Sequence, residues 1–598
     1  MQHWAASTVV RSVCVFCRPT DRRRRATLIG AFDVPRQPII WRGLNFMQHS
    51  MAILALPFLF SLRKHALAAC ALLALTACGG ASDTASTGTA GGVNQLLSEP
   101  VAGTQAPAAD APAKPEPMPE PLPAMPAVLS EDGQRPLLAA IAASYPVIQQ
   151  LERKEATGQV RALEAARIDA NLDRARADLA SIKRNLASLS ASGLPTYALI
   201  HNVASDGSLS AWIVFPDGGV VAGATRVPYA GLGTLQGGLG VDRIAATRGP
   251  QLKGQEKQRL DADRDVDADT DADTDAGADR GAGKRDNSPE SIKKRREVMA
   301  DAVATLLPGD IRQVLAAGEG RLLVVPVRDT GTAPYAALPI RNQDDFAARR
   351  WSFVVMQDLG VLADSESGSG FDMGKVDLSK SIIVGDPEDM RDVKYSFPAL
   401  PGARKEAIAI AGELGVDEQN VLIGSRATRK NVVSAIDRSA GKGVIYMATH
   451  AVADPRNPLT RGFVVLSQEN LFAGELRTKK FNGWSKRQPL VVMSACQTAL
   501  GRVFEGGTFG VARTWTNAGA GQVVASLWNV SDLATYRLMT RFVAGLKQGK
   551  VPELAMQAAQ LDTIKNYPND PKMWASFTII GKPSIDSRTT EQRSGSAR

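Results

Sequence analysis

The sequence predicts an α/β protein whose C-terminal half forms a mostly parallel sheet with helices on both faces. Residues 443–450 and 489–496 are short apolar runs rich in β-branched residues, and each begins at a Gly or a Pro, which is typical of a buried strand. Helical patterns surround these runs, and strands that alternate with helices form parallel sheets. We therefore expect a three-layer α/β/α sandwich.

The same alternation continues from about Met299 to the C-terminal region. The candidate strands are Arg321–Val327, Ser381–Gly385, Asn420–Ile423, Val444–Ala448, Phe463–Leu466, Leu490–Ala495 and Gln522–Leu527. The candidate helices are Ala403–Leu414, Thr428–Arg438, Thr508–Asn517, Ala534–Leu546 and Pro552–Ile564. This density of elements places the sandwich over residues 291–581.

A small helical and β-hairpin region is expected before the sandwich, over residues 128–257. Residues 129–190 are rich in Ala, Leu and Arg at helical spacing, with a break near Tyr145-Pro146. Residues 197–203 and 209–215 form two strand-like runs around a Ser-Asp-Gly turn. A repeat of about 34 residues is absent from the sequence, so a tetratricopeptide array is not expected.

Three segments have the composition of flexible chain. Residues 79–127 are rich in Ala and Pro and predict a linker, and residues 582–598 predict a disordered tail. Residues 258–290 contain an acidic run with Asp at nearly every second position, which predicts a disordered insert. A calcium loop would need Gly and Glu where the chain has Ala276 and Ala282. The basic run at 293–296 indicates the exposed start of a helix.

Residues 1–78 have the pattern of a bacterial lipoprotein leader. A positive segment at 63–65 precedes a short apolar core at 66–75, and Leu75-Thr-Ala-Cys78 resembles a lipoprotein box. The resemblance implies a true start at Met47 or Met51 and lipidation at Cys78. It implies membrane anchoring at the cell envelope, and Gly79 favours the outer membrane, facing the periplasm. An ordinary cleaved signal peptide or an uncleaved anchor is the alternative.

The overall composition excludes several classes of function. The formal net charge is +9, but the leader contributes to it, and no basic stripe is interleaved with aromatic residues. Nucleic-acid binding is therefore not expected. The sequence contains no phosphate-binding loop, zinc-ligand pattern or flavin fingerprint, so we expect neither a metal nor a cofactor.

After the leader, the chain contains one cysteine and two histidines, and His450 and Cys496 each end one of the two apolar runs. Parallel strands share a polarity, so both side chains are expected at the same carboxyl edge, where open α/β sheets bind ligands. Cys and His together form a nucleophile and its base. Each alone has a structural alternative, a small buried hydrophobe for Cys496 and a hydrogen-bonded residue for His450. His201 lies in the first hairpin strand and is expected to be a partly exposed strand residue.

The motifs around these two residues resemble the CHAT domain family. They are Tyr446-Met-Ala-Thr-His450-Ala, Val491-Val-Met-Ser-Ala-Cys496-Gln-Thr and Gly519-Ala-Gly-Gln-Val-Val-Ala-Ser-Leu-Trp528-Asn-Val-Ser-Asp532. The resemblance covers residues 306–581 and implies a caspase-like fold and a cysteine peptidase with a Cys-His dyad.

The resemblance also implies the remaining parts of a peptidase site. The backbone N–H groups of Cys496 and Ala451 would form the oxyanion hole, although the family usually has Gly where this chain has Ala451. Ser494 and Asp386 would shape the first subsite, and Asp386 has the alternative of capping a turn. Trp528 and Asp532 are pocket candidates too, with a core role and a helix N-cap as their alternatives.

Two functions remain open at this point. The first is a cysteine endopeptidase that acts on a protein or peptide substrate at the cell envelope. The second is a catalytically inactive CHAT-like scaffold that binds partner proteins. A thiol-disulfide oxidoreductase would need a second cysteine near Cys496, and the sequence has none there.

Overall fold

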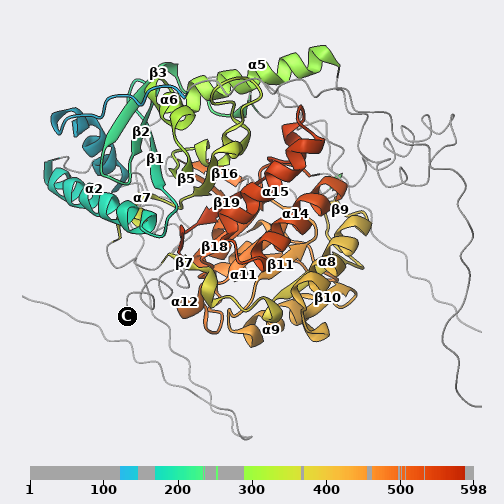
Figure 1. The fold of residues 1–598 in the computed structure, drawn as a ribbon. Helices are drawn as coiled ribbons and strands as arrows, with labels where there is room; N and C mark the ends of the chain where they lie inside the picture. Colours follow the sequence, from blue (N-terminus) through green and yellow to red (C-terminus); the bar gives the residue numbers. More distant parts are fainter. Residues whose placement is uncertain are drawn as a thin grey trace, which may run out of the picture. The chain divides into compact units, whose positions relative to one another are not determined.

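The computed structural model describes residues 122–145, 169–233, 235, 251–252, 288–364, 370–453, 461–495, 498–499, 501–504, 507–530 and 532–585 (Figure 1). The leader with Cys78, the acidic run and Cys496 lie outside these residues. Most of the expected linker also lies outside them. The described chain continues to Ile585, four residues beyond the expected end of the sandwich at 581.

An eleven-stranded sheet forms the centre of the described structure, in the order β10-β8-β11-β15-β18-β19-β6-β5-β1-β2-β3. Seven of its ten strand pairs are parallel, which confirms the expected mostly parallel α/β fold. The strands are β1 (Thr196–Val203), β2 (Ser208–Val214), β3 (Val220–Pro228), β5 (Gly320–Val325), β6 (Trp351–Val355), β8 (Ile382–Pro387), β10 (Val421–Gly424), β11 (Ile445–Ala448), β15 (Leu490–Ser494), β18 (Gln522–Ser526) and β19 (Phe577–Gly581).

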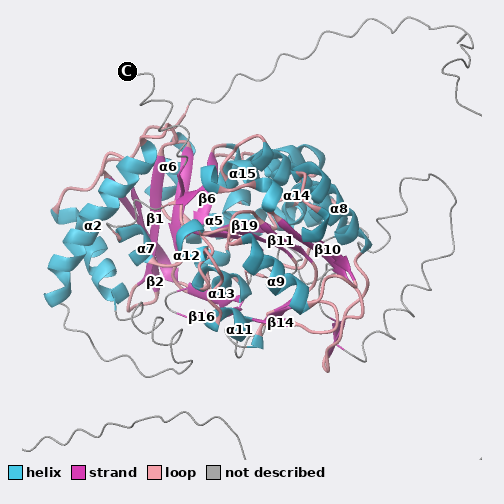
Figure 2. Ribbon diagram, turned by 90° about the horizontal axis from the view of Figure 1, so that it is seen from below, coloured by secondary structure: helices cyan, strands magenta, loops and turns pink. Residues whose placement is uncertain are grey.

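Helices cover both faces of this sheet, as Figure 2 shows for its C-terminal half, with α8, α14 and α15 on one side and α9, α11 and α13 on the other. The longer described helices are α2 (Asp169–Ser190), α5 (Pro289–Leu306), α6 (Asp310–Ala317), α8 (Pro401–Leu414), α9 (Arg429–Ser439), α14 (Asp532–Lys547) and α15 (Pro552–Asn566). The shorter ones are α7 (Leu359–Ala363), α11 (Ala473–Thr478), α12 (Trp484–Arg487) and α13 (Val511–Asn517). Every residue of β11, β15 and β18 is buried, and most are apolar, as expected for strands covered on both faces.

The sheet changes polarity between β18 and β19, which pair antiparallel. Strands β10, β8, β11, β15 and β18 run in one direction, whereas β19, β6, β5 and β1 run in the other. The carboxyl end of β5 therefore lies at the opposite edge from the carboxyl ends of β11 and β15. The carboxyl ends of β8, β11, β15 and β18 lie at one edge of the sheet. This is the edge at which His450 and Cys496 are expected.

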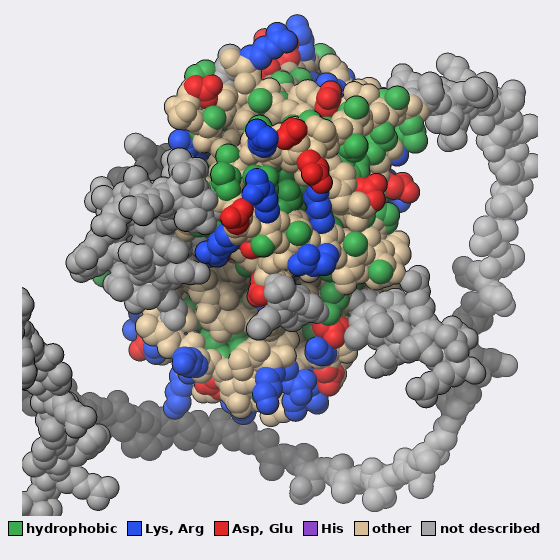
Figure 3. All heavy atoms as spheres, turned by 90° about the vertical axis from the view of Figure 1, so that its left-hand side faces the viewer, with side chains coloured by type: hydrophobic (Ala, Val, Ile, Leu, Met, Phe, Trp, Pro, Cys, Tyr) green, Lys and Arg blue, Asp and Glu red, His purple; other side chains and the backbone are tan. Residues whose placement is uncertain are grey.

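The expected hairpin at 197–215 is confirmed, but it belongs to the same sheet as the rest. β1 pairs antiparallel with β2 and parallel with β5, in a register that includes Tyr197↔Leu322. The face around α2 carries Lys, Arg, Asp and Glu side chains interspersed with one another (Figure 3). This mixture is typical of a solvent-exposed surface.

Two expected elements differ from the structure. The strand predicted at 463–466 is β13 (Phe463–Val464), which pairs with β12 (Ala451–Val452) and β14 (Leu471–Phe472) in a separate small sheet. The helix predicted at 508–517 is preceded by β17 (Gly507–Gly510), so α13 begins only at Val511. Both segments are apolar and short, and periodicity alone cannot assign such segments to a sheet.

The basic run at 293–296 is only partly exposed. Lys293 and Lys294 are exposed, but Arg295 is buried, because it lies one helical turn before Met299 on the face of α5 that packs inward. The prediction of a fully exposed helix start is therefore wrong for this residue.

His201 is also more buried than expected. Its side chain in β1 is 5% exposed, and Nε2 lies 2.9 Å from the carbonyl oxygen of Leu306. A neutral imidazole that donates through Nε2 satisfies this geometry. Burial lowers the pKa of His201 to about 4.

The buried His201 predicts an acid-sensitive fold. The unfolded chain takes up a proton near pH 6.5 and the folded chain near pH 4, so stability falls as the pH drops from 6.5 towards 4. The loss at pH 4 is roughly 3 kcal/mol if the full difference in pKa is realised. Urea denaturation at several pH values measures it. His201→Gln retains an amide donor for the Leu306 carbonyl and should flatten the pH dependence; an unchanged slope would contradict the assignment to His201.

Candidate functional site

Strands β11 and β15 bring the expected site to one edge of the sheet. They are parallel neighbours, and their register ends at the pair Ala448↔Ser494. His450 follows two residues after Ala448, and Cys496 follows two residues after Ser494 in the sequence. Because Cys496 lies outside the described residues, the distance from its sulfur to the imidazole stays a prediction.

His450 is fully buried and contacts the segment that precedes α8. Its Nε2 lies 2.8 Å from the carbonyl oxygen of Pro398, and its ring centroid lies 5.3 Å from that of Phe397. A carbonyl oxygen only accepts, so Nε2 carries the proton in this contact. In the neutral imidazole Nδ1 then has the basic lone pair. The contact with Pro398 therefore selects Nδ1 as the nitrogen that exchanges a proton with a nucleophile.

The chain after His450 is fixed by the small sheet. The Thr449 hydroxyl donates to the carbonyl oxygen of Val465 at 2.7 Å, and the Val465 N–H donates to the carbonyl oxygen of His450 at 2.9 Å. Ala451 then pairs with Val464 across β12 and β13. These bonds orient the backbone from 449 to 452.

Ala451 occupies its position without backbone strain. It is buried, and it is not among the described non-glycine residues with positive φ. The bond from Val465 to His450 makes Ala451↔Val464 the non-hydrogen-bonded pair of this antiparallel ladder. The Ala451 N–H therefore points away from β13, as an oxyanion donor must.

We expect Ala451→Gly to change the rate of peptide cleavage by less than about threefold. The alanine already has a backbone conformation open to all residues, so glycine relieves no strain and only adds freedom to the unfolded chain. Steady-state kinetics of both proteins measure this. A large gain in kcat for the glycine variant would show that Ala451 holds the donor in the wrong place.

The described residues on either side of Cys496 are hydrogen-bonded to the end of β18. The Ser526 hydroxyl donates to the carbonyl oxygen of Ala495, and it accepts from the N–H of Thr498 at 3.2 Å. The Ser526 N–H in turn donates to the Thr498 hydroxyl at 2.8 Å, and the Ala499 N–H donates to the Ser526 carbonyl oxygen at 2.9 Å. All four residues are buried. These hydrogen bonds were not predicted from the sequence, because Ser526 has no distinguishing feature beyond its place at the end of an apolar strand.

Ser526→Ala removes the hydroxyl that bonds to residues on both sides of Cys496. We expect it to slow alkylation of Cys496 by an active-site-directed ketone roughly tenfold to a hundredfold, since displacing a reacting group by about 1 Å has effects of this order. The matched control is Ser352→Ala. Ser352 is 1% exposed in β6, and its hydroxyl has no hydrogen-bond partner among the described residues. Equal labelling rates for wild type and both variants would exclude a positioning role for Ser526.

Asp386 has both carboxylate oxygens engaged in the structure. Oδ1 accepts from the Leu400 N–H and Oδ2 from the Arg404 guanidinium, each at 2.8 Å. The residue is 6% exposed and has a φ of 40°, which Asp tolerates better than most residues. These contacts join β8 to the start of α8 and favour the capping interpretation over a subsite for basic side chains.

Of the other pocket candidates, Ser494 and Trp528 are buried. Ser494 is buried within β15 opposite Ala448. Trp528 is 2% exposed and its indole N–H donates to the Lys572 carbonyl oxygen at 3.4 Å, so it lies in the core and does not line an open groove. Asp532 is the first residue of α14, one position later than the expected N-cap, and its side chain is not described.

An aromatic cluster next to His450 was not predicted. The rings of Tyr395, Phe397, Phe463 and Phe472 lie within 5.2–6.5 Å of one another in consecutive pairs, and Phe397 contacts His450. Phe472 is 37% exposed, so the cluster reaches the surface. Its members come from the segment after β8 and from β13 and β14, and only the tertiary structure brings them together.

Comparison with known proteins identifies the C-terminal part of the chain. The CHAT domain profile matches residues 297–582, so this part of the chain is a CHAT domain. Tetratricopeptide repeat protein 28 is 24% identical in Mus musculus and 23% identical in Homo sapiens, each over 314 residues. That match covers 46% of this chain and only 12% of each relative.

Solved structures show distant similarity. The Arg-specific cysteine proteinase gingipain R is 12% identical with a TM-score of 0.31, and the match covers 50% of this chain and 68% of that chain. The Saccharomyces cerevisiae separase–securin complex contains a chain that is 10% identical with a TM-score of 0.41, covering 76% of this chain and 34% of that chain. At such values neither likeness carries an argument about activity.

Proposed function

We propose that this protein is a cysteine endopeptidase with Cys496 as nucleophile and His450 as its proton-transfer partner. The observation that carries the proposal is the parallel register of β11 and β15, which ends at Ala448↔Ser494, two residues before His450 and Cys496 respectively. The CHAT domain at 297–582 supports it, since both residues belong to that domain.

The proposed reaction uses the described contacts directly. His450 Nδ1 removes the thiol proton, because Nε2 is bound to the Pro398 carbonyl oxygen. The thiolate attacks the peptide carbonyl carbon, and the negative charge on the oxygen is stabilised by the N–H groups of Ala451 and Cys496. The C–N bond breaks as His450 returns the proton to the leaving nitrogen. Water then hydrolyses the thioester, releasing the acid and regenerating the thiol.

The test is covalent labelling with a panel of acyloxymethyl ketone peptides, which alkylate only an activated thiol in a substrate site. We expect wild type to be labelled and Cys496→Ala to be unlabelled, with matching cleavage of a peptide library. If neither labelling nor cleavage occurs with basic, acidic or apolar peptides, the peptidase proposal fails. The inactive scaffold that binds partner proteins would then be the better proposal.

We further propose that the protein is lipidated at Cys78 and anchored at the cell envelope, where a protein or peptide is its substrate. The support is the Leu75-Thr-Ala-Cys78 box in the sequence. Within the described ranges, no helix has the length and apolarity needed to cross a bilayer. Metabolic labelling with a fatty-acid analogue should mark wild type and not Cys78→Ala; an unlabelled wild type would exclude lipidation.

A further inference from the structure

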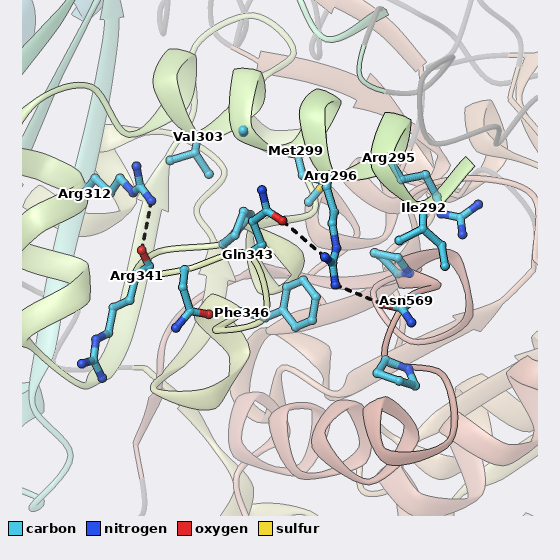
Figure 4. Close-up of a pocket in the computed structure, with 15 residues that line it drawn as sticks. Ile292, Arg295, Arg296, Met299, Val303, Arg312, Arg341, Gln343, Phe346 and Asn569 are labelled. Carbon is cyan, nitrogen blue, oxygen red and sulfur yellow. Dashed lines mark hydrogen bonds between the residues drawn. The ribbon is translucent and has the colours of Figure 1, made fainter. Parts of the chain in front are cut away.

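A cavity of about 340 Å³ lies apart from the residues of the proposed peptidase site. Three parts of the chain form most of it, as Figure 4 shows: α5, the segment 339–346 and the segment 568–571 after α15. Its volume falls at the lower end of the range for small-molecule sites.

The floor of the cavity is apolar and buried. Met299 and Val303 from α5 are 3% and 2% exposed, and Phe346 is 7% exposed. The Phe346 ring packs edge-on against Trp574, with ring centroids 5.0 Å apart. An apolar floor of this kind suits a hydrocarbon or aromatic group.

The polar lining has only one sign of charge. Of the fifteen lining residues four are arginines, namely Arg295, Arg296, Arg312 and Arg341, and none is Asp or Glu. Asn342, Gln343 and Asn569 add three amide groups. Outside the lining, the Asp344 carboxylate lies 2.8 Å from Arg296 and the Asp345 carboxylate lies 3.8 Å from Arg341.

Two of these arginines have charge available to a ligand. Arg296 extends from α5 towards Gln343 and Asn569, and its partner Asp344 is 70% exposed (Figure 4). An ion pair with an exposed carboxylate contributes little to stability, so a ligand carboxylate can readily replace Asp344 as the partner of Arg296. Arg312 donates to two neutral acceptors, the carbonyl oxygens of Ile340 and Arg341. Guanidinium groups match carboxylates in geometry as well as charge.

We propose that this cavity binds a small amphipathic carboxylate, with the carboxylate on Arg296 and Arg312 and an apolar body on Met299 and Phe346. A neutral apolar molecule would fill the floor but offer no carboxylate to Arg312, whose two acceptors are neutral carbonyl oxygens. A small polar anion would satisfy the arginines and leave the floor unfilled. Nothing in the proposed peptidase reaction requires this second site.

The test is isothermal titration calorimetry of the full chain with three probes. 4-Phenylbutyrate has both features, 4-phenylbutanol lacks the charge and butyrate lacks the ring. We expect 4-phenylbutyrate to bind at least tenfold more tightly than either of the others. Equal affinity for the alcohol or for butyrate would overturn the proposal, as would a wild type that does not bind 4-phenylbutyrate at millimolar concentration.

Variants assign the binding to this cavity. Arg312 is exposed, so Arg312→Gln should fold as wild type and weaken 4-phenylbutyrate binding at least fivefold. Arg296→Gln should have a similar effect. The matched control is Arg537→Gln, because Arg537 lines a different cleft, between α14 and α15. Unchanged affinity in both Arg296→Gln and Arg312→Gln, or an equal loss in the control, would contradict the assignment.

Discussion

His450→Ala is expected to lower kcat for peptide cleavage by a factor of about 10⁴ or more, since removing the proton-transfer partner of a catalytic nucleophile has effects of this size. The alanine can neither promote the thiolate nor protonate the leaving nitrogen. KM should change little, because His450 is buried and contributes no open binding surface. Steady-state kinetics on a peptide cleaved by wild type measure both constants.

The chain provides a matched control for this variant. His201 is the other histidine in the described residues, is equally enclosed and also donates through Nε2 to a backbone carbonyl oxygen. At pH 8, where His201 is neutral in the folded and the unfolded chain, His201→Gln should keep near-wild-type kcat. If both variants lose activity equally, the loss comes from the fold and not from proton transfer.

The strands that position this site were predictable because of their burial. β11 and β15 are covered on both faces, so each lies in a mainly apolar run, and the candidate residues His450 and Cys496 end these two runs. The neighbouring motif around Trp528 shows the limit of this reasoning. A large aromatic residue after a strand fits a groove or a core equally well, and only its 2% exposure decides for the core.

The polarity of β19 and the joining of β1 to β5 were not predictable from local patterns. β19 (Phe577–Gly581) follows α15, and a strand after a helix is normally expected to run parallel to its neighbour. Its antiparallel pairing with β18 depends on the long-range register Gln522↔Gly581. In the same way, the aromatic cluster beside His450 depends on loops whose conformations are set by tertiary contacts.

A buried polar network links the hairpin region to the CHAT domain within their shared sheet. Arg321 in β5 forms an ion pair with Glu553 in α15 at 2.7 Å, with side chains 2% and 0% exposed. Arg321 also donates to the Thr196 hydroxyl in β1 at 3.0 Å, and Ser584 donates to Glu553 at 2.6 Å. The network thus links β1, the CHAT domain and the chain beyond residue 581.

Glu553→Gln is expected to lower the free energy of unfolding by about 3–5 kcal/mol, because it leaves the Arg321 guanidinium buried without its counter-charge. The urea midpoint at constant slope measures this. The matched control is Glu413→Gln, whose partner Lys547 lies 3.2 Å away in a pair with side chains 54% and 44% exposed. That control should change stability by less than about 1 kcal/mol.

The double variant Arg321→Met with Glu553→Leu separates charge burial from packing. Replacing a buried ion pair with apolar side chains of similar volume is often neutral or stabilising, so the double variant should recover most of the stability that Glu553→Gln loses. Since Thr196 and Ser584 contact the same pair, the hairpin region should unfold together with the CHAT domain in every variant. Separate transitions for the two regions, or a Glu553→Gln loss no larger than that of Glu413→Gln, would show that the network does not join them into one cooperative unit.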